Sequence, residues 1–382
     1  MLTGLDVFLK DRAPEIAGKR VGLISNHTGI DASFRGTIDL LHASDRLDLV
    51  ALFGLEHGVR GDAQAGDHVG ESIDQRTGLP TYSLYGDTRW PTADMLNGLD
   101  ALVFDIQDKG VRFYTYLSTM IHVQEAAASN GIAFVVLDRP NPINGNRIEG
   151  NLVDADFQSF VGCHPIPIRH GMTFGELARM FAAERGWPEP LVMAMQGWRR
   201  AQWFDETDLP WVAPSPNLPT LDAAMLYPGT CLIEGTNLSE GRGTTRPFEL
   251  IGAPWVEPFV LAAELDRRNL PGVAFRPTWL TPMFSKHAKA SCGGVQVHIV
   301  DRDAMRPVAM GMHLLESLRT LHPDEFEWRQ NEPDKYFIDL LLGSDQPRQR
   351  LDAGELVELV LADWEVDIRA FEGRRQPFLL YS

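Results

Sequence analysis

Polar side chains follow four short apolar segments in the first part of the chain, and their types could carry acid–base chemistry or bind a polar ligand. The four groups are Asn26-His27-Thr28-Gly29, Glu56-His57-Gly58-Val59-Arg60-Gly61, Asp105-Ile106-Gln107-Asp108 and Asp138-Arg139-Pro140-Asn141-Pro142. Glu56 lies where an apolar segment gives way to a glycine turn, so its carboxyl group can face a ligand. A carboxylic acid beside apolar side chains is favoured in its neutral form, which general acid catalysis needs. Phe53, Leu55 and Val59 could supply such apolar surroundings for Glu56.

Several of these polar side chains also have a structural interpretation. Asp105 follows apolar residues and could be a buried carboxylate that accepts hydrogen bonds from backbone N–H groups. His27 could hydrogen-bond a turn, and Asp138 could form an internal ion pair with Arg139. Both interpretations stay open at this point.

The apolar segments that precede these groups are expected to be parallel β-strands. The expected strands lie at 20–25, 47–54, 101–106 and 132–137. The expected helices between them have apolar residues at helical spacing, at 36–43, 92–99 and 116–130. Continuous apolar strands that alternate with helices are typical of a parallel sheet covered on both faces. Ligands of open α/β sheets bind at the carboxyl ends of the strands, so we expect the site at that edge.

The pattern changes towards the end of the chain. The strand–helix alternation continues more loosely, with a helix at 173–185 that Thr173 could cap and strands at 191–195 and 229–233. Residues 294–300 alternate with period two, as a half-exposed strand does, and helices are expected at 307–321 and 354–371. We predict a parallel α/β domain over residues 1–253 and a smaller α+β domain over residues 254–382.

Charge and composition exclude several classes of protein. The 382 residues include 35 Lys and Arg against 52 Asp and Glu, a formal net charge of −17. Neither a nucleic acid nor an anionic membrane is an expected partner, because both are bound through cations. No apolar stretch approaches the roughly 20 residues that span a bilayer. With no signal-peptide pattern at the start and 3 widely spaced cysteines, we expect a cytoplasmic protein, or an exported one if a leader has been removed from the chain.

Familiar cofactor and nucleophile motifs are missing from the sequence. It has no G-x-G-x-x-G in the first strand–helix turn, no P-loop and no G-x-S-x-G elbow. A metal-dependent hydrolase stays an alternative, because acceptable zinc or manganese ligands are present, although without H-x-x-x-H or H-x-E spacing. Those residues are His27, Glu56, His57, Asp105 and Asp138. A non-catalytic saccharide-binding module is a third interpretation.

Six longer segments resemble one bacterial family. They are 56–61 (EHGVRG), 79–86 (LPTYSLYG), 103–120 (VFDIQDKGVRFYTYLSTM), 137–142 (LDRPNP), 215–219 (SPNLP) and 234–247 (EGTNLSEGRGTTRP). From about Val21 to the C-terminal tail, the chain resembles the exo-β-N-acetylmuramidase family. The resemblance implies a Rossmann-like catalytic domain with a C-terminal auxiliary domain. It also implies release of N-acetylmuramic acid from the non-reducing end of peptidoglycan fragments, with Glu56 of the E-H-G motif as catalytic acid.

The candidate site residues lie in or beside these segments. The expected catalytic residues are Glu56 and Asp105. The expected substrate-binding residues are Asn26, His27, His57, Arg60, Gln107, Asp108, Arg112, Tyr114, Asp138, Arg139, Asn141, Asn217, Glu234, Asn237, Glu240 and Arg242. We expect no metal and no cofactor. The expected partner is a saccharide or muropeptide, imported because the chain begins without the leader that family members tend to carry, and the oligomeric state stays open.

Glycoside hydrolysis needs a proton for the leaving oxygen and stabilisation of an oxocarbenium-like transition state. The second catalytic group stays open between the substrate's own 2-acetamido group and several carboxylates, namely Asp105, Asp108, Asp138, Glu234 and Glu240. The lactyl carboxylate of N-acetylmuramic acid needs a nearby cation, and arginine suits carboxylates because it binds them bidentately. The candidates are Arg60, Arg112, Arg139 and Arg242. Three tyrosines could stack on a sugar face, namely Tyr85, Tyr114 and Tyr116.

Overall fold

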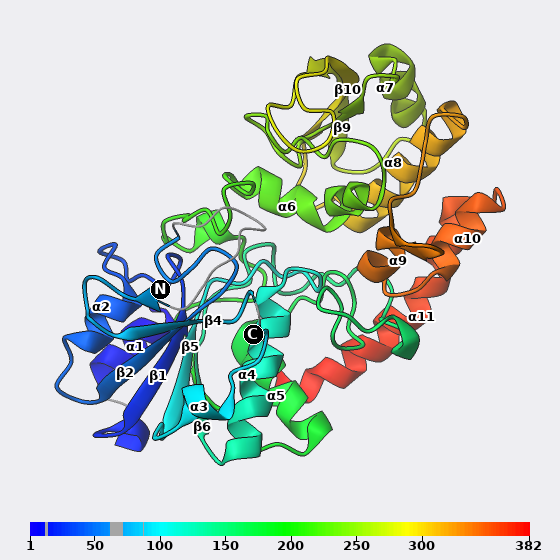
Figure 1. Cartoon of the computed structure of the whole chain (residues 1–382). Coiled ribbons are helices and arrows are strands. Elements are labelled where there is room, and N and C mark those ends of the chain that lie inside the picture. Colours follow the sequence, from blue (N-terminus) through cyan, green and yellow to red (C-terminus); the bar gives the residue numbers. More distant parts are fainter. Residues whose placement is uncertain (12–13, 62–71, 87) are drawn as a thin grey trace.

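The computed structural model describes residues 1–11, 14–61, 72–86 and 88–382, and it has two lobes (Figure 1). The larger lobe contains a seven-stranded sheet with the strand order β3-β4-β2-β1-β5-β6-β7. Its strands are β1 (Arg20–Ser25), β2 (Asp48–Gly54), β3 (Ser72–Ile73), β4 (Pro80–Ser83), β5 (Ala101–Asp105), β6 (Ala133–Leu137) and β7 (Leu191–Met193). All neighbouring pairs are parallel except β3 with β4. The carboxyl ends of β2, β1, β5 and β6 therefore share one edge, as predicted.

Helices cover both faces of this sheet. They are α1 (Gly4–Asp11), α2 (Thr37–His42), α3 (Ala93–Leu96), α4 (Tyr116–Asn130) and α5 (Phe174–Arg185). Leu102 and Phe104 of β5 join one hydrophobic cluster with α4 and α5. Val103 points the other way and joins a second cluster with α1 and α2. This alternation buries the strand on both sides, which confirms the Rossmann-like parallel sheet.

The smaller lobe is built on a three-stranded antiparallel sheet with the order β8-β10-β9. Its strands are β8 (Leu250–Ala253), β9 (Val273–Leu280) and β10 (Cys292–Ile299), and a two-stranded ribbon pairs β11 (Gln330–Glu332) with β12 (Lys335–Tyr336). Its helices are α6 (Leu221–Thr230), α7 (Pro258–Arg267), α8 (Pro307–Leu321), α9 (Phe337–Leu342), α10 (Gln346–Asp352) and α11 (Val357–Arg375).

Short 3₁₀ helices occur along the whole chain. They are η1 (Pro14–Ile16), η2 (Ala155–Phe157), η3 (Phe204–Glu206), η4 (Cys231–Gly235) and η5 (Gln376–Phe378).

One predicted strand is wrong. Residues 229–233 complete α6 and enter η4 instead of forming a strand. Helix α6 packs against α8 so closely that a Cβ on Gly229 would lie 1.8 Å from the backbone oxygen of Pro307. A Cβ on Gly311 of α8 would in turn lie 2.4 Å from the backbone oxygen of Gly229. The two glycines therefore serve a helix crossing, which local sequence pattern does not reveal.

The other predicted helices and strands are present, with ends shifted by a few residues. Thr173 caps α5, where its hydroxyl oxygen accepts a bond from the Glu176 N–H at 3.3 Å, and Gly186 ends the helix at φ 68°. Such a left-handed C-cap favours glycine. No helix in the described part of the chain is long and apolar enough to cross a membrane.

The domain boundary predicted at 253/254 would place β8 in the first domain, although the sheet to which β8 belongs lies in the smaller lobe. Strand β8 pairs with β10, and α6 packs on α8, so the smaller lobe begins well before residue 254. We propose a boundary near α6 on this ground.

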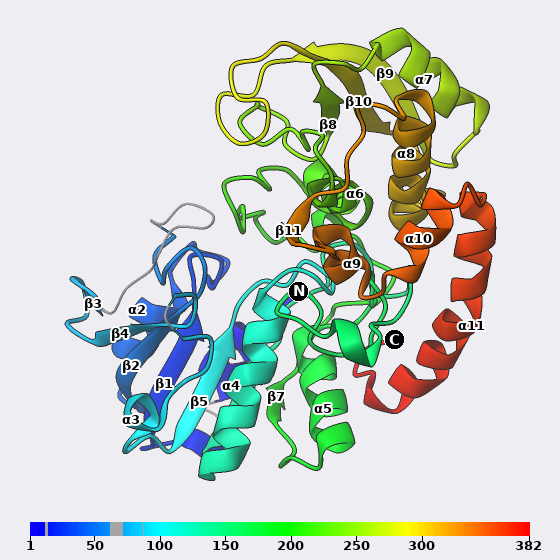
Figure 2. The same cartoon turned by 45° about the vertical axis from the view of Figure 1, so that its right-hand side comes forward.

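The chain finally returns to the larger lobe. Helix α11 runs from the smaller lobe down to α5, as Figure 2 shows. Tyr381 donates a hydrogen bond to Asp138 at the end of β6 at 2.5 Å, and the Leu380 N–H donates to Glu176 of α5 at 2.8 Å. Residues from the end of the sequence thus complete the first lobe.

Candidate active site

Glu56 lines a cavity of about 170 Å³ to which both lobes contribute side chains. The turn after β2 carries Glu56, the turn after β4 carries Tyr85, and the segment before α4 carries Tyr114 and Thr115. The other lining residues are Phe113, Val161, Ser215, Asn217, Leu218, Tyr227, Cys231, Glu234, Arg242, Phe248, Phe337 and Leu341. The predicted edge of the sheet therefore forms one wall, and the smaller lobe forms the opposite wall.

The carboxyl group of Glu56 is held by two hydroxyls. Tyr85 donates to Oε1 at 3.2 Å and Thr115 donates to Oε2 at 3.4 Å. Burial, followed by the nearby Glu56 carboxylate, raises the pKa of Tyr85 to about 12, so this hydroxyl keeps its proton. Two fixed donors orient the carboxyl group toward the cavity that it lines.

The apolar surroundings expected for Glu56 come from other residues than predicted. Phe53, Leu55 and Val59 pack into the hydrophobic clusters of the sheet and do not line the cavity. The cavity takes its apolar surface from aromatic residues around it, among them Phe113 and Phe248. A strand end can present only one face to a site, so its neighbouring apolar residues point into the core.

A second carboxylate, Glu234, faces the same cavity from η4. Arg242 donates to it at 2.6 Å and lies 3.3 Å from Glu240. Burial raises the pKa of Glu234, which is the direction that disfavours its charged form. Burial lowers the pKa of Arg242, but the two carboxylates outweigh it and the net shift is upward. The arginine therefore stays charged between them.

Asp105 lies away from this cavity. It is fully buried and makes a two-point ion pair with Arg139, at 2.5 Å to Oδ1 and 2.9 Å to Oδ2. Thr37 donates to the same carboxylate. With its oxygens occupied in this way, Asp105 braces β5 against the neighbouring loop. This placement supports the structural interpretation and not the catalytic one.

Asp138 is likewise engaged in the core. Its Oδ2 accepts from the hydroxyls of Thr173 at 2.7 Å and Tyr381 at 2.5 Å, and its Oδ1 accepts from the Gly175 N–H at 2.9 Å. Burial raises its pKa to about 6. The predicted ion pair between Asp138 and Arg139 is replaced by Arg139 with Asp105.

Besides Arg139, two more of the four arginines proposed for the lactyl group have partners outside the cavity. Arg60 pairs with Asp39 and Asp74, each at 3.0 Å. The guanidinium of Arg112 is buried and donates to backbone carbonyls on both lobes, including Ile166 at 2.7 Å and Leu342 at 2.8 Å. Arg242 is the one of the four that lines the Glu56 cavity.

The amides predicted at the strand ends hold the loops at this edge of the sheet, within one loop for Asn26 and between segments for Gln107 and Asn141. The side chain of Asn26 accepts from the Thr28 N–H at 2.9 Å, Gln107 donates to the Pro140 carbonyl at 2.8 Å, and Asn141 donates to the Met172 carbonyl at 3.0 Å. These bonds hold the edge of the sheet together, and none of the three amide side chains lines the Glu56 cavity.

The two histidines lie behind the cavity wall. His27 bonds the carbonyl of Ala213, 186 residues away, through Nε2 at 2.7 Å, and burial lowers its pKa. His57 is buried, and its ring centroid is 6.5 Å from that of His27. Neither residue lines the Glu56 cavity.

Asp108 belongs to a buried polar group. Its Oδ2 is 3.6 Å from Nε2 of His170, and its Oδ1 accepts from the Lys109 N–H at 2.6 Å. Burial raises the pKa of Asp108 and lowers that of Lys109. The Lys109 ammonium lies 4.8 Å from the ring centroid of Trp211, a distance at which a cation–π contact is favourable.

The remaining predicted residues lie in or beside the site. Tyr114 and Asn217 line the Glu56 cavity, and Tyr116 contacts Tyr114 edge to face at 4.7 Å. Asn237 and Glu240 line an adjoining cavity of about 910 Å³, together with Glu234 and Arg242. The structure therefore brings together residues from segments 56–61, 79–86, 103–120, 215–219 and 234–247.

Several residues of the site were not predicted from the sequence. Thr115 and Tyr227 line the smaller cavity, and Lys286, Trp328 and Tyr336 line the larger one. Thr115 lies inside a segment that carries the family resemblance. The other four come from the smaller lobe, whose helices and turns gave no signal that they would face the sheet edge.

The metal-dependent alternative gains no support from the arrangement. Within residues 1–11, 14–61, 72–86 and 88–382, no group of three or more His, Cys, Asp or Glu side chains is placed to hold a metal ion. Asp105 and Asp138 point into separate hydrogen-bond networks, which removes two of the five proposed ligands.

Fold and cavity together define a two-domain α/β protein with two carboxylates and an arginine at the junction of the domains. The chain belongs to the exo-beta-N-acetylmuramidase NamZ family, whose N-terminal model matches residues 21–222 and whose C-terminal model matches residues 225–381. It is 48% identical over 380 residues to the peptidoglycan beta-N-acetylmuramidase NamZ of Bacillus subtilis (strain 168), which covers 99% of this chain and 91% of that protein.

Two solved structures from Bacteroides fragilis NCTC 9343 are similar over the whole chain. Both are described as DUF1343 family proteins, and the alignments cover 100% of this chain and 99% of each of theirs. The first has a TM-score of 0.91 at 41% identity, and the second a TM-score of 0.77 at 30% identity. The two-lobed arrangement is thus shared with experimentally determined relatives.

Proposed function

We propose that this chain is an exo-β-N-acetylmuramidase, a glycoside hydrolase that releases N-acetylmuramic acid from the non-reducing end of peptidoglycan fragments. Its membership of the family and its 48% identity to the Bacillus subtilis enzyme support this reading. The structural observation that carries it is that Glu56 and Glu234 line one cavity, because glycoside hydrolysis needs a pair of carboxyl groups beside the scissile bond.

Glu56 acts as the general acid. Its carboxyl group faces the cavity from a rigid strand end and is oriented by Tyr85 and Thr115, so a proton on it can be aimed at the leaving oxygen. A positioned proton donor contributes about 10²–10⁴ in rate. We assign the second role to Glu234 in place of Asp105, since Glu234 is the second carboxylate that lines the cavity among the described residues, whereas Asp105 is saturated by Arg139 and Thr37.

Arg242 holds the lactyl carboxylate that distinguishes N-acetylmuramic acid from N-acetylglucosamine. It lines the cavity beside Glu234, and arginine presents two parallel N–H donors to a carboxylate. The half-buried Tyr85 and the buried Tyr114 and Tyr227 supply apolar surface for the sugar ring.

Incubation with para-nitrophenyl N-acetylmuramide beside the N-acetylglucosamine analogue tests the function. We expect release of nitrophenol from the muramide and little from the glucosaminide. Turnover of neither compound, together with saccharide binding, would instead identify a non-catalytic muropeptide-binding protein. NMR of the first sugar product would then distinguish a retaining from an inverting reaction.

A further inference from the structure

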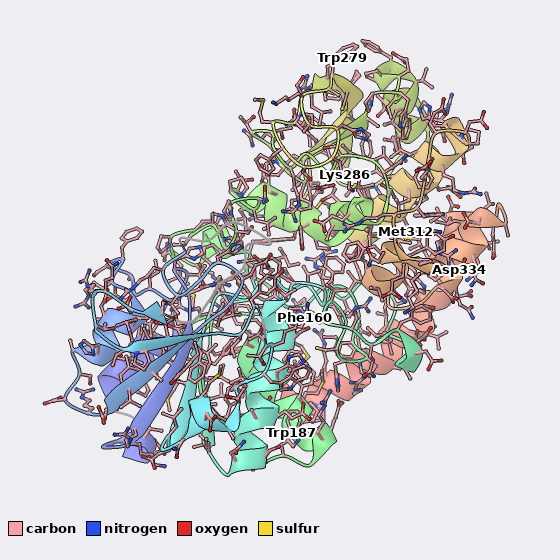
Figure 3. All side chains as sticks on the ribbon, in the orientation of Figure 1. Phe160, Trp187, Trp279, Lys286, Met312 and Asp334 are labelled. Atoms are coloured by element: carbon pink, nitrogen blue, oxygen red, sulfur yellow. The ribbon has the colours of Figure 1, made fainter. Side chains whose placement is uncertain are left out.

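The larger cavity, of about 910 Å³, lies in the smaller lobe and adjoins the Glu56 cavity. The two cavities share Glu234 and Arg242, so this ion pair marks their junction. The other walls of the larger cavity are the turn around Lys286 and the segment from Glu327 to Tyr336. Figure 3 shows Lys286 on the side of the small sheet that faces α6, whereas Trp279 lies at the opposite, outer end of the lobe.

Given the proposed function, the difference in volume between the two cavities indicates in which direction a bound glycan runs through the site. An exo-acting enzyme needs an enclosed site for one terminal sugar, and the rest of the chain must leave through a wider opening. The cavity of about 170 Å³ is the smaller of the two and contains Glu56, so we place the terminal sugar there. A volume of about 910 Å³ is at the upper end for small-molecule sites and has room for more than one sugar. We propose that the larger cavity is the leaving-group site, which binds the saccharide units on the reducing-end side of the scissile bond and not their stem peptides.

The charges of this cavity favour the sugar units of a glycan over an anionic stem peptide. Glu234 pairs with Arg242 at 2.6 Å, and Glu240 pairs with Lys286 at 3.1 Å. Glu327 and Arg329 then add one charge of each sign to the lining. With Arg242 assigned to the lactyl group of the terminal sugar, the remaining cations among the described lining residues are Lys286 and Arg329, and Glu240 and Glu327 balance them. They do not form the kind of arginine cluster through which sites recognise acidic peptides.

The uncharged lining groups match the chemistry of a sugar. Thr236, Asn237, Ser285 and Gln330 offer hydroxyl and amide groups, and Trp328 and Tyr336 offer aromatic surface. Ligand sites typically combine aromatic surface with a few placed polar groups in this way.

The wall that carries Lys286 is held in place before any ligand arrives. The Lys286 ammonium donates to the backbone oxygens of Ile233 at 3.1 Å and Leu238 at 2.8 Å, and His287 Nε2 bonds the Asn237 oxygen at 2.7 Å. Ser285 and His287 both have positive φ, at 70° and 54°. A turn fixed by this many contacts loses little freedom on binding, which favours affinity.

Substrates that differ only in the leaving group test the proposal. The substrates are para-nitrophenyl N-acetylmuramide, the peptide-free disaccharide N-acetylmuramyl-N-acetylglucosamine and its peptide-free tetrasaccharide. The variants are Gln330→Ala and Tyr336→Ala, both of which line the larger cavity alone. We expect kcat/KM to fall about five- to tenfold for the two oligosaccharides, the loss of one hydrogen bond or ring contact, and to stay within about twofold for the nitrophenyl compound.

Gln349→Ala is the matched control, because Gln349 is an exposed glutamine of α10 that lines neither cavity. Equal effects of Gln330→Ala and Tyr336→Ala on all three substrates, or no effect on any, would overturn the proposal. An effect confined to peptide-bearing fragments would overturn it too and would assign the cavity to the stem peptide.

A binding measurement separates this proposal from the proposed function. Calorimetry with the peptide-free tetrasaccharide on the Glu56→Gln protein, with and without Gln330→Ala, needs no turnover. We expect the second substitution to weaken binding about five- to tenfold. If the wild-type protein hydrolyses none of the substrates but this difference remains, the enzymatic assignment fails while the saccharide site stands. Unchanged binding would refute the site even in an active enzyme.

Discussion

Glu56 and Glu234 approach the same cavity with different partners, and this difference bears on their roles. Hydroxyls of Tyr85 and Thr115 contact Glu56, and these can either donate to a carboxylate or accept from a carboxylic acid. Glu234 faces the permanent cation of Arg242. A proton can therefore come and go on Glu56 without loss of its contacts, which suits the residue that delivers it.

Glu56→Gln should lower kcat for para-nitrophenyl N-acetylmuramide by about 10²–10⁴, because the amide keeps the shape and hydrogen bonds but has no acidic proton. Steady-state kinetics on the purified variant measure this. The control is Glu189→Gln, since Glu189 is an exposed glutamate that lines neither cavity and lies 3.3 Å from its ion-pair partner Arg179. Turnover of the Glu56 variant near the wild-type rate would remove the residue from the mechanism.

Arg242→Ala should reduce the preference for muramides over glucosaminides. A charge-assisted bond to the lactyl carboxylate is worth about 1.5–3 kcal/mol, so the ratio of kcat/KM between the two substrates should drop about 10- to 100-fold. Arg60→Ala is the comparison, because Arg60 is paired with Asp39 and Asp74 away from the cavity and should leave this ratio unchanged. A preserved ratio in the Arg242 variant contradicts the assignment.

At the scale of helices and strands, the sequence was most informative where periodicity is strong. The strands at 20–25 and 101–105 and the helix at 116–130 have continuous apolar or helical patterns, and they are present. The strand predicted at 229–233 is wrong because Gly229 belongs to the contact between α6 and α8. Helix α8 lies some 80 residues further along the chain, so the local pattern could not reveal this contact.

The candidate site was predicted in part for a related reason. Sequence places Glu56 and Asp105 alike at strand ends, but it cannot say which carboxylate finds a buried arginine. Arg139 is 34 residues from Asp105 and saturates it, and Arg112 turned out to bond carbonyls of both lobes. The wall of the smaller lobe depends on tertiary packing, so its contribution through Lys286 and Trp328 became visible only in the structure.

Helix α11 packs on α5 through the ion pair between Arg374 and Glu184, whose contribution to stability should depend on pH. Although burial acts in the opposite direction, hydrogen bonds from His164 and Arg374 lower the pKa of Glu184 to about 2. A carboxylate with a lowered folded pKa contributes stability above its unfolded pKa, near 4.5, and this contribution is lost as the pH falls towards 2. Glu184→Gln should therefore lower Tm at pH 6 but much less at pH 3. Thermal denaturation at both pH values checks this, with Glu189→Gln as the exposed control. An equal decrease in Tm of the Glu184 variant at pH 6 and pH 3 would contradict the prediction.

At the scale of the whole molecule, the two lobes are joined by more than the chain between α5 and α6. Arg112 bonds the backbone of both lobes, and the segment after α11 returns to the end of β6. A lobe that depends on such contacts cannot unfold alone without exposing buried polar groups. The cavity between the lobes gains a fixed width from the same contacts.

Tyr381→Phe should destabilise the protein by about 1–3 kcal/mol, because it removes a donor from the fully buried Asp138. Chemical denaturation followed by the fluorescence of the 9 tryptophans should show one transition, shifted to lower denaturant as a unit. Tyr82→Phe, in the half-buried strand β4, is the control and should shift it little. Two separate transitions in the Tyr381 variant, with only one of them moved, would show that the lobes unfold independently.

The bond between Tyr381 and Asp138 also bears on how the chain is made. Segment 380–382 is translated only after every residue of the smaller lobe, yet it supplies partners to Asp138, Glu176 and Arg200 of the larger one. Domains usually fold on the ribosome in order of synthesis, the N-terminal one first. We therefore expect the larger lobe to complete its packing only after the C-terminal segment has been synthesised, although most of its residues come first in the chain.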